Sequence, residues 1–130
     1  MTICSCSTHY STDNLLNKLD YNRLLQLYAD DTDTLATHIE LFLNDVMPQF
    51  QDLEERIQRL DWTGVTSLTH QLRPWLAMVG LTDLENKLWE IEKEAHNRPA
   101  FESLQAQWIS FRAKLQQMTF VLGDELQRIK

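Results

Sequence analysis

Apolar residues recur at intervals of three and four positions along most of the chain, with no stretch that alternates apolar and polar residues one by one. Spacing of three and four places side chains on one face of an α-helix, whereas alternation would indicate a β-strand. The chain also contains only three glycines and three prolines, so few positions interrupt a helix. The pattern therefore predicts an all-α protein.

One short and four long amphipathic segments account for this pattern. The short helix is expected around residues 21–28, and the apolar stripes of the long helices cover residues 35–60, 65–79, 84–95 and 101–122. Because only a few residues connect the long helices, we expect an antiparallel four-helix bundle with a short extra N-terminal helix. Residues 1–14 are polar and lack periodicity, which predicts a flexible N-terminal tail ahead of a single domain at 15–130.

Local signals indicate where the first two long helices bend, begin and end. Pro48 lies inside the 35–60 stripe, which continues in phase after it, so we expect a kink near Asn44 rather than a break. Asp61 is suited to cap the start of the next helix, and Gly80 is suited to the left-handed position that ends it.

Similar signals mark the next two connections. Thr82 and Glu85 have the spacing of a capping box, which predicts that Thr82 caps the helix over 84–95. Asn97 and Pro99 suit the cap and first positions of the last helix.

The charge balance narrows the class of partner. The chain has 12 basic and 19 acidic residues, a formal net charge of -7, which argues against binding nucleic acid or an anionic membrane surface. No apolar run approaches the roughly 20 residues that span a bilayer, and the N-terminus lacks the order of a secretory signal. We therefore expect a soluble, cytoplasmic protein.

Cys4 and Cys6 are interpreted as reduced tail residues rather than as metal ligands with His9.

His70 is the residue that most needs an explanation. On a helix that turns 100° per residue, it falls about 175° from the inward direction of its own apolar stripe and so faces solvent. Pro74 and Ala77 follow on the same outer strip, and Arg73 lies one turn along and to the side. A surface histidine is by itself an ordinary solvated residue, so its neighbours decide the interpretation.

The stretch THQLRPWLAMVGLTDLENKLWEIE resembles the signature of histidine-containing phosphotransfer (HPt) domains. In that signature the phosphorylated histidine is followed by an apolar residue, a basic residue, a glycine and two further apolar residues at set distances. These positions hold Leu72, Arg73, Gly80, Leu81 and Leu84. Upstream, LFLNDVMPQFQDLEERIQRLDW is similar to the second helix of the family, including its interior proline, so the resemblance covers about 65 residues, from 33 to 97.

The chain departs from the family pattern at two positions. Arg73 stands where the family most often has lysine, which keeps the charge and adds a planar fork that can grip phosphate oxygens. Pro74 stands where the family usually has a small residue. Because proline cannot donate to the carbonyl of His70 and crowds it, we expect the backbone there to bend outward.

The resemblance implies a phosphocarrier of two-component signalling that is not a kinase. His70 would accept the phosphoryl group on Nε2, Arg73 would stabilise it, and Glu92, at the family's position for an acidic or amide side chain, would orient the imidazole. The implied partners are response-regulator receiver domains and a hybrid sensor histidine kinase. The protein would have no metal site and no cofactor of its own, with Mg²⁺ supplied by the receiver. The residues expected at the docking surface are Pro74, Ala77, Met78 and Gly80.

Two other classes of function compete with this interpretation. A metal-carboxylate bundle enzyme needs Glu-x-x-His pairs, and no histidine here has a glutamate three residues before it. A helical adaptor or scaffold without phosphotransfer remains the alternative.

The other histidines and the tryptophans are given structural interpretations. His38 lies at the edge of its stripe, and His96 is interpreted as a surface group favoured by the helix dipole. Core packing is expected of the tryptophans, Trp62, Trp75, Trp89 and Trp108.

Overall fold

The computed structural model describes residues 19–130, so the predicted tail at 1–14, with Cys4, Cys6 and His9, lies outside the described residues. Within the described part, every regular element is a helix. In chain order the helices are α2 (Tyr21–Tyr28), α3 (Thr32–Leu41), the π-helical segment η1 (Phe42–Val46), α4 (Met47–Gln58), α5 (Trp62–Met78), α6 (Thr82–His96) and α7 (Phe101–Ile129).

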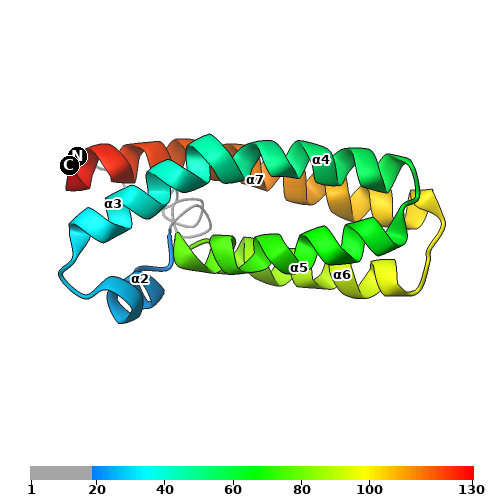
Figure 1. The fold of residues 1–130 in the computed structure, drawn as a ribbon, viewed down its shortest axis with the longest axis horizontal. Coiled ribbons are helices and arrows are strands. Elements are labelled where there is room, and N and C mark those ends of the chain that lie inside the picture. Colours follow the sequence, from blue (N-terminus) through cyan, green and yellow to red (C-terminus); the bar gives the residue numbers. More distant parts are fainter. Residues whose placement is uncertain (1–18) are drawn as a thin grey trace, which may run out of the picture.

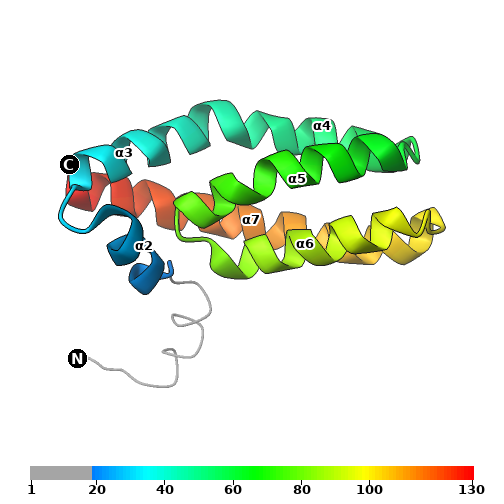
Figure 2. The same ribbon diagram turned by 60° about the horizontal axis from the view of Figure 1, so that its bottom comes forward.

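Four rods pack side by side into an antiparallel bundle (Figures 1 and 2). The first rod is continuous and consists of α3, η1 and α4; α5, α6 and α7 form the other three. Contacts run from α4 to α5, from α5 to α6 and from α6 to α7, and α7 closes the ring against α3 and α4. The short α2 lies across the end of the bundle where α3 begins and α5 ends (Figure 2). The predicted all-α bundle with a short extra helix is confirmed.

The apolar stripes of the rods meet in one core. Each rod contributes side chains with almost no exposed surface, which include Ile39, Leu53, Leu72, Leu88 and Leu104. Burial of apolar area of this kind is the main favourable term in folding. Trp62 and Trp108 are buried as expected, and Trp75 packs partly buried against the core. The prediction for Trp89 is wrong, because its side chain is 39% exposed.

The irregularity predicted near Asn44 is a π-helical segment. The N–H of Met47 donates to the carbonyl of Phe42, five residues back instead of four. The next residue, Pro48, has no N–H for the carbonyl of Asn44. A local widening of the helix accommodates the missing donor, and the rod continues without losing the phase of its apolar stripe.

The ends of α5 agree with the sequence signals. The Asp61 carboxylate accepts from the N–H of Gly64 at 3.0 Å and caps the first turn. At the other end Gly80 has φ +80°, and the N–H of Leu81 donates to the carbonyl of Leu76 at 2.9 Å. This six-to-one bond with a left-handed glycine is the usual way to end a helix.

Two predictions about the later helix ends are wrong. Thr82 does not cap α6, because its hydroxyl donates instead to the carboxylate of Asp20 at 2.6 Å, and Leu81 holds the cap position without a side-chain bond. Asn97 is the C-terminal cap of α6 rather than the start of α7. Arg98 takes a left-handed φ of 48°, and the chain then extends as far as Ala100, so α7 begins only at Phe101.

Side-chain hydrogen bonds fix α2 to the bundle. The hydroxyl of Tyr28 donates to the carbonyl of Met78 at 2.8 Å and also meets Nδ1 of His38 at 2.7 Å. Tyr21 donates to the buried carboxylate of Glu125 at 2.9 Å. Burial and this bond both raise the pKa of the Tyr21 hydroxyl.

None of the helices within residues 19–130 is both long and apolar enough to cross a membrane.

Candidate functional site

His70 projects from the middle of α5, and 74% of its side-chain surface is exposed, which confirms the prediction that it faces solvent. Its neighbours along the helix, Thr69 and Leu72, are buried, so the backbone beneath the imidazole is held by the core. The hydroxyl of Thr69 donates to the carbonyl of Thr66 within the same helix. A rigid helix therefore presents a reactive ring to the surroundings.

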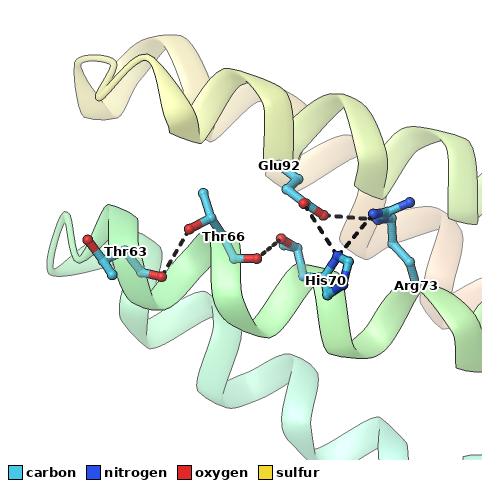
Figure 3. A network of polar contacts seen from close by, with 6 residues as sticks. Thr63, Thr66, His70, Arg73 and Glu92 are labelled. Carbon is cyan, nitrogen blue, oxygen red and sulfur yellow. Dashed lines mark hydrogen bonds and ion pairs between the residues drawn. The ribbon is translucent and has the colours of Figure 1, made fainter.

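Glu92 approaches His70 from the facing helix α6 (Figure 3). Its side chain is only 7% exposed, which confirms the expectation that it lies at the edge of the core and leans toward α5. A carboxylate with so little access to water needs a positive or hydrogen-bonding partner. Arg73 supplies one, since its Nε donates to Oε1 of Glu92 at 2.9 Å.

The three side chains form a triangle around one nitrogen of the imidazole. A terminal nitrogen of Arg73 lies 3.3 Å from Nδ1 of His70, and Oε2 of Glu92 lies 3.9 Å from the same atom. Figure 3 shows both contacts reaching the ring from the side of α6. The Arg73 and Glu92 contacts therefore both use Nδ1, and neither occupies Nε2.

Trp89 completes the site, and the sequence interpretation missed it. The central carbon of the Arg73 guanidinium lies 4.4 Å from the centroid of the Trp89 ring, within the range of a cation–π contact. Nζ of Lys93 lies 5.4 Å from the same ring. The available signal was the spacing of three residues between Trp89 and Glu92, which places both on one face of α6.

This arrangement has the elements of a phosphoryl-transfer site: an exposed imidazole on a rigid helix, a cation one turn away and a carboxylate fixed behind the ring. Residues 23–130 of the chain match the sequence model of the Hpt domain family. The chain belongs to the Hpt domain family. Hpt domains are phosphocarriers rather than kinases, and they take part in histidine phosphotransfer in two-component signalling, where they interact with receiver domains. Searches of curated proteins and of solved structures gave no significant match.

The face of the Hpt domain beyond His70 is only partly as the sequence suggested. Pro74 is exposed, while Ala77 and Met78 are half-buried. Gly80 is buried, and a Cβ placed on it would lie 3.1 Å from the side chain of Leu24. We therefore correct its assignment to the docking surface: α2 covers Gly80, which serves to end α5.

Pro74 lies inside α5 without ending it, since the helix runs from Trp62 to Met78. The carbonyl of His70 receives no N–H from residue 74, because proline has none. The Hpt domain thus carries a backbone acceptor directly beneath its exposed histidine. The outward bend of this segment stays a prediction.

The other described histidines of this Hpt domain lie in different settings. His38 is half-buried between Tyr28 and Trp75, with its ring centroid 5.5 Å from the first and 6.4 Å from the second. Because the hydroxyl proton of Tyr28 goes to Met78, Nδ1 of His38 is the donor in their hydrogen bond. His96 is exposed in the last turn of α6, where a positive charge suits the helix dipole.

Proposed function

We propose that His70 is the phosphorylated residue of this Hpt domain and that it exchanges a phosphoryl group with the aspartate of a response-regulator receiver domain. The main support is the contrast between the two ring nitrogens: Arg73 and Glu92 converge on Nδ1, and both contacts leave Nε2 as the atom for chemistry. The exposure of the ring allows a folded partner to reach that atom.

The transfer is an in-line displacement at phosphorus. The lone pair of Nε2 forms the new N–P bond while the P–O bond to the aspartate breaks, and the aspartate leaves as a carboxylate. During the attack Nδ1 carries the ring proton, and the positive charge that develops on the ring faces the Glu92 carboxylate. The Arg73 guanidinium stabilises the phosphoryl oxygens, on which negative charge is spread in the transition state. The reverse sequence returns the group to a receiver.

The receiver supplies the remaining components in this proposal. We assign Mg²⁺ to the partner's acidic pocket, where it neutralises charge on the phosphoryl oxygens. A hybrid sensor histidine kinase, through a receiver of its own, is a suitable source of the group. The cytoplasmic location expected from the sequence follows from such partners.

The docking surface extends from His70 along α5 to Pro74, Ala77 and Met78. Pro74 is the exposed member, and the short side chain of Ala77 leaves room for a partner helix or loop. A small exposed surface of mixed character suits an encounter that must form and dissociate for each transfer. We therefore expect weak, transient binding.

The direct test is label transfer from a receiver. The protein is incubated with a phosphorylated receiver domain and Mg²⁺, and the expected product carries a label that acid removes and base does not. The label should disappear in His70→Gln and persist in the matched variant His96→Gln, which removes another exposed histidine. Label that survives in His70→Gln, or no label from any receiver of the same cell, would contradict the proposal and favour the adaptor alternative.

A further inference from the structure

Arg73 makes three contacts at once, and only one of them is with His70. Its Nε bonds to Glu92 at 2.9 Å, a terminal nitrogen meets Nδ1 at 3.3 Å, and the central carbon of the guanidinium lies 4.4 Å from the centroid of the Trp89 ring. With 23% of its side chain exposed, Arg73 is more enclosed than His70, which is 74% exposed. The cation is held in place before any phosphoryl group arrives.

We propose that Trp89 is a positioning residue of this site: with Glu92 it holds the Arg73 guanidinium against Nδ1 of His70 and thereby keeps the unloaded imidazole in the tautomer that carries its proton on Nε2. The inference rests on the proposed function, because it concerns how His70 is kept before phosphorylation. Neither the sequence signature nor the expected function of His70 assigns a part to Trp89.

The tautomer follows from the donors and acceptors. A guanidinium has only N–H donors, so Nδ1 must offer its lone pair when Arg73 bonds to it. A neutral imidazole has one proton, which then resides on Nε2. In this form Nε2 has no free lone pair and cannot attack phosphorus. The free protein is therefore held in a resting form of its own nucleophile.

Release of Arg73 reverses the assignment. Phosphoryl oxygens on a docked receiver compete with Nδ1 for the guanidinium. A guanidinium forms stronger hydrogen bonds to charged phosphoryl oxygens than to a neutral ring nitrogen. The Nε2 proton passes to water, and Nδ1 takes a proton from water, so the ring stays neutral. Oε2 of Glu92, 3.9 Å away, is then the acceptor for Nδ1–H. The lone pair appears on Nε2 when a phosphoryl group is present to receive it.

Trp89 is suited to this task because it binds the cation without competing for its N–H groups. The ring face attracts the guanidinium through its quadrupole and leaves the donors to Glu92 and Nδ1. Lys93 also lies near the ring, 5.4 Å from its centroid, but it is paired with Glu90 at 2.9 Å. Because Trp89 is 39% exposed, it contributes little to the core. Its main structural role is therefore the contact with Arg73.

The test reads the tautomer directly. Long-range ¹H–¹⁵N correlation spectra of the His70 ring distinguish the two neutral forms in the unloaded protein, along a pH titration that continues until the ring is neutral. Trp89→Ala should shift the ratio toward Nδ1–H by about two- to fivefold, the equilibrium factor of an exposed cation–π contact. Trp89→Phe keeps a ring face and should restore most of the wild-type ratio. Arg73→Ala should shift the ratio at least as far as Trp89→Ala.

Phe120→Ala is the matched control, since Phe120 is an aromatic side chain on α7 with 78% exposure, and it should leave the ratio unchanged. With folded spectra, an unchanged tautomer ratio in Trp89→Ala overturns the role of Trp89, and an unchanged ratio in Arg73→Ala overturns the tautomer assignment itself. The measurement needs no partner, so its failure is separate from failure of the proposed function. If His70 accepts label but the tautomer ratio is the same in Trp89→Ala and wild type, only the role of Trp89 is rejected. If the ratio shifts in Trp89→Ala but no label is transferred, only phosphotransfer is rejected.

Discussion

Nε of Arg73 and Oε1 of Glu92 lie 2.9 Å apart, and this ion pair joins α5 to α6 at the level of the exposed histidine. The side chain of Glu92 is 7% exposed and that of Arg73 is 23% exposed. Because the carboxylate has little access to water, the guanidinium is needed to compensate its negative charge. The same pair therefore bears on two properties, the stability of the α5–α6 contact and the chemistry at His70.

Replacing Arg73 should affect transfer more than any other single change apart from loss of His70. Arg73→Ala should lower the initial rate of label transfer from a phosphorylated receiver by about 10- to 100-fold, because a preorganised donor to the phosphoryl oxygens is lost. Arg73→Lys keeps the charge and should stay within about tenfold of wild type. Equal rates for Arg73→Ala and wild type would show that another group carries that charge.

The Arg73 and Glu92 substitutions should not be additive in stability. Arg73→Ala leaves the Glu92 carboxylate nearly buried and unpaired, at a cost of about 1–3 kcal/mol, whereas the same change in a Glu92→Gln background removes a partner from a neutral amide. Urea unfolding of the wild type, both single variants and the double variant should give a coupling energy of about 1 kcal/mol or more. A coupling energy near zero would mean that the pair contributes nothing in solution.

Gly80 and Gly123 offer a comparison between two glycine-to-alanine changes with opposite signs. At Gly80 the φ of +80° disfavours a Cβ, and the added atom would lie 3.1 Å from Leu24, so Gly80→Ala should destabilise the protein by about 1–2 kcal/mol. Gly123 lies within α7 with no atom within 4 Å of an added Cβ, so Gly123→Ala should stabilise it by about 0.5–1 kcal/mol. Thermal or urea unfolding measures both, and the same sign for both would refute the argument.

Sequence periodicity was sufficient for the bundle because each rod carries an uninterrupted stripe whose members meet in one core. Single cap residues were also predictable where the side chain bonds to its own helix, as at Asp61. Thr82 was not, because its hydroxyl bonds to Asp20, 62 residues away in the sequence. A local pattern has no information about such a distant partner.

In the candidate site, too, features set by a single helix were predictable from the sequence, and those set by a distant partner were not. The exposure of His70 and the approach of Glu92 follow from helical geometry, since each depends mainly on direction around one helix. The position of Trp89 does not, because an apolar ring at a boundary position can turn into the core or cover a cation on the next helix. Here Arg73 on α5 provides a contact outside the core, with its guanidinium 4.4 Å from the ring centroid.

Glu54 gives a stability prediction away from the site. The indole N–H of Trp108 and a terminal nitrogen of Arg112 both donate to its Oε1 at 2.8 Å, and these bonds join α4 to α7. The bond from Trp108 first, and then that from Arg112, holds the pKa of Glu54 below its ordinary value of 4.5. Because the folded state favours the ionised form, the carboxylate stabilises the protein above the ordinary pKa, and this stabilisation is lost as the pH falls through the lowered value.

Glu54→Gln should therefore cost about 1 kcal/mol at neutral pH, a figure that allows for the partial exposure of the ion pair. The difference from wild type should begin to shrink as the pH falls below about 4.5, where the unfolded carboxyl takes up a proton, and should be lost once the pH is below the lowered pKa of the folded state. Glu55→Gln, at the exposed neighbouring position, is the matched control and should change stability little at either pH. Urea unfolding at pH 7 and at pH 3 measures these differences. A Glu54→Gln deficit that stays constant between the two would show that its origin is packing rather than the carboxylate charge.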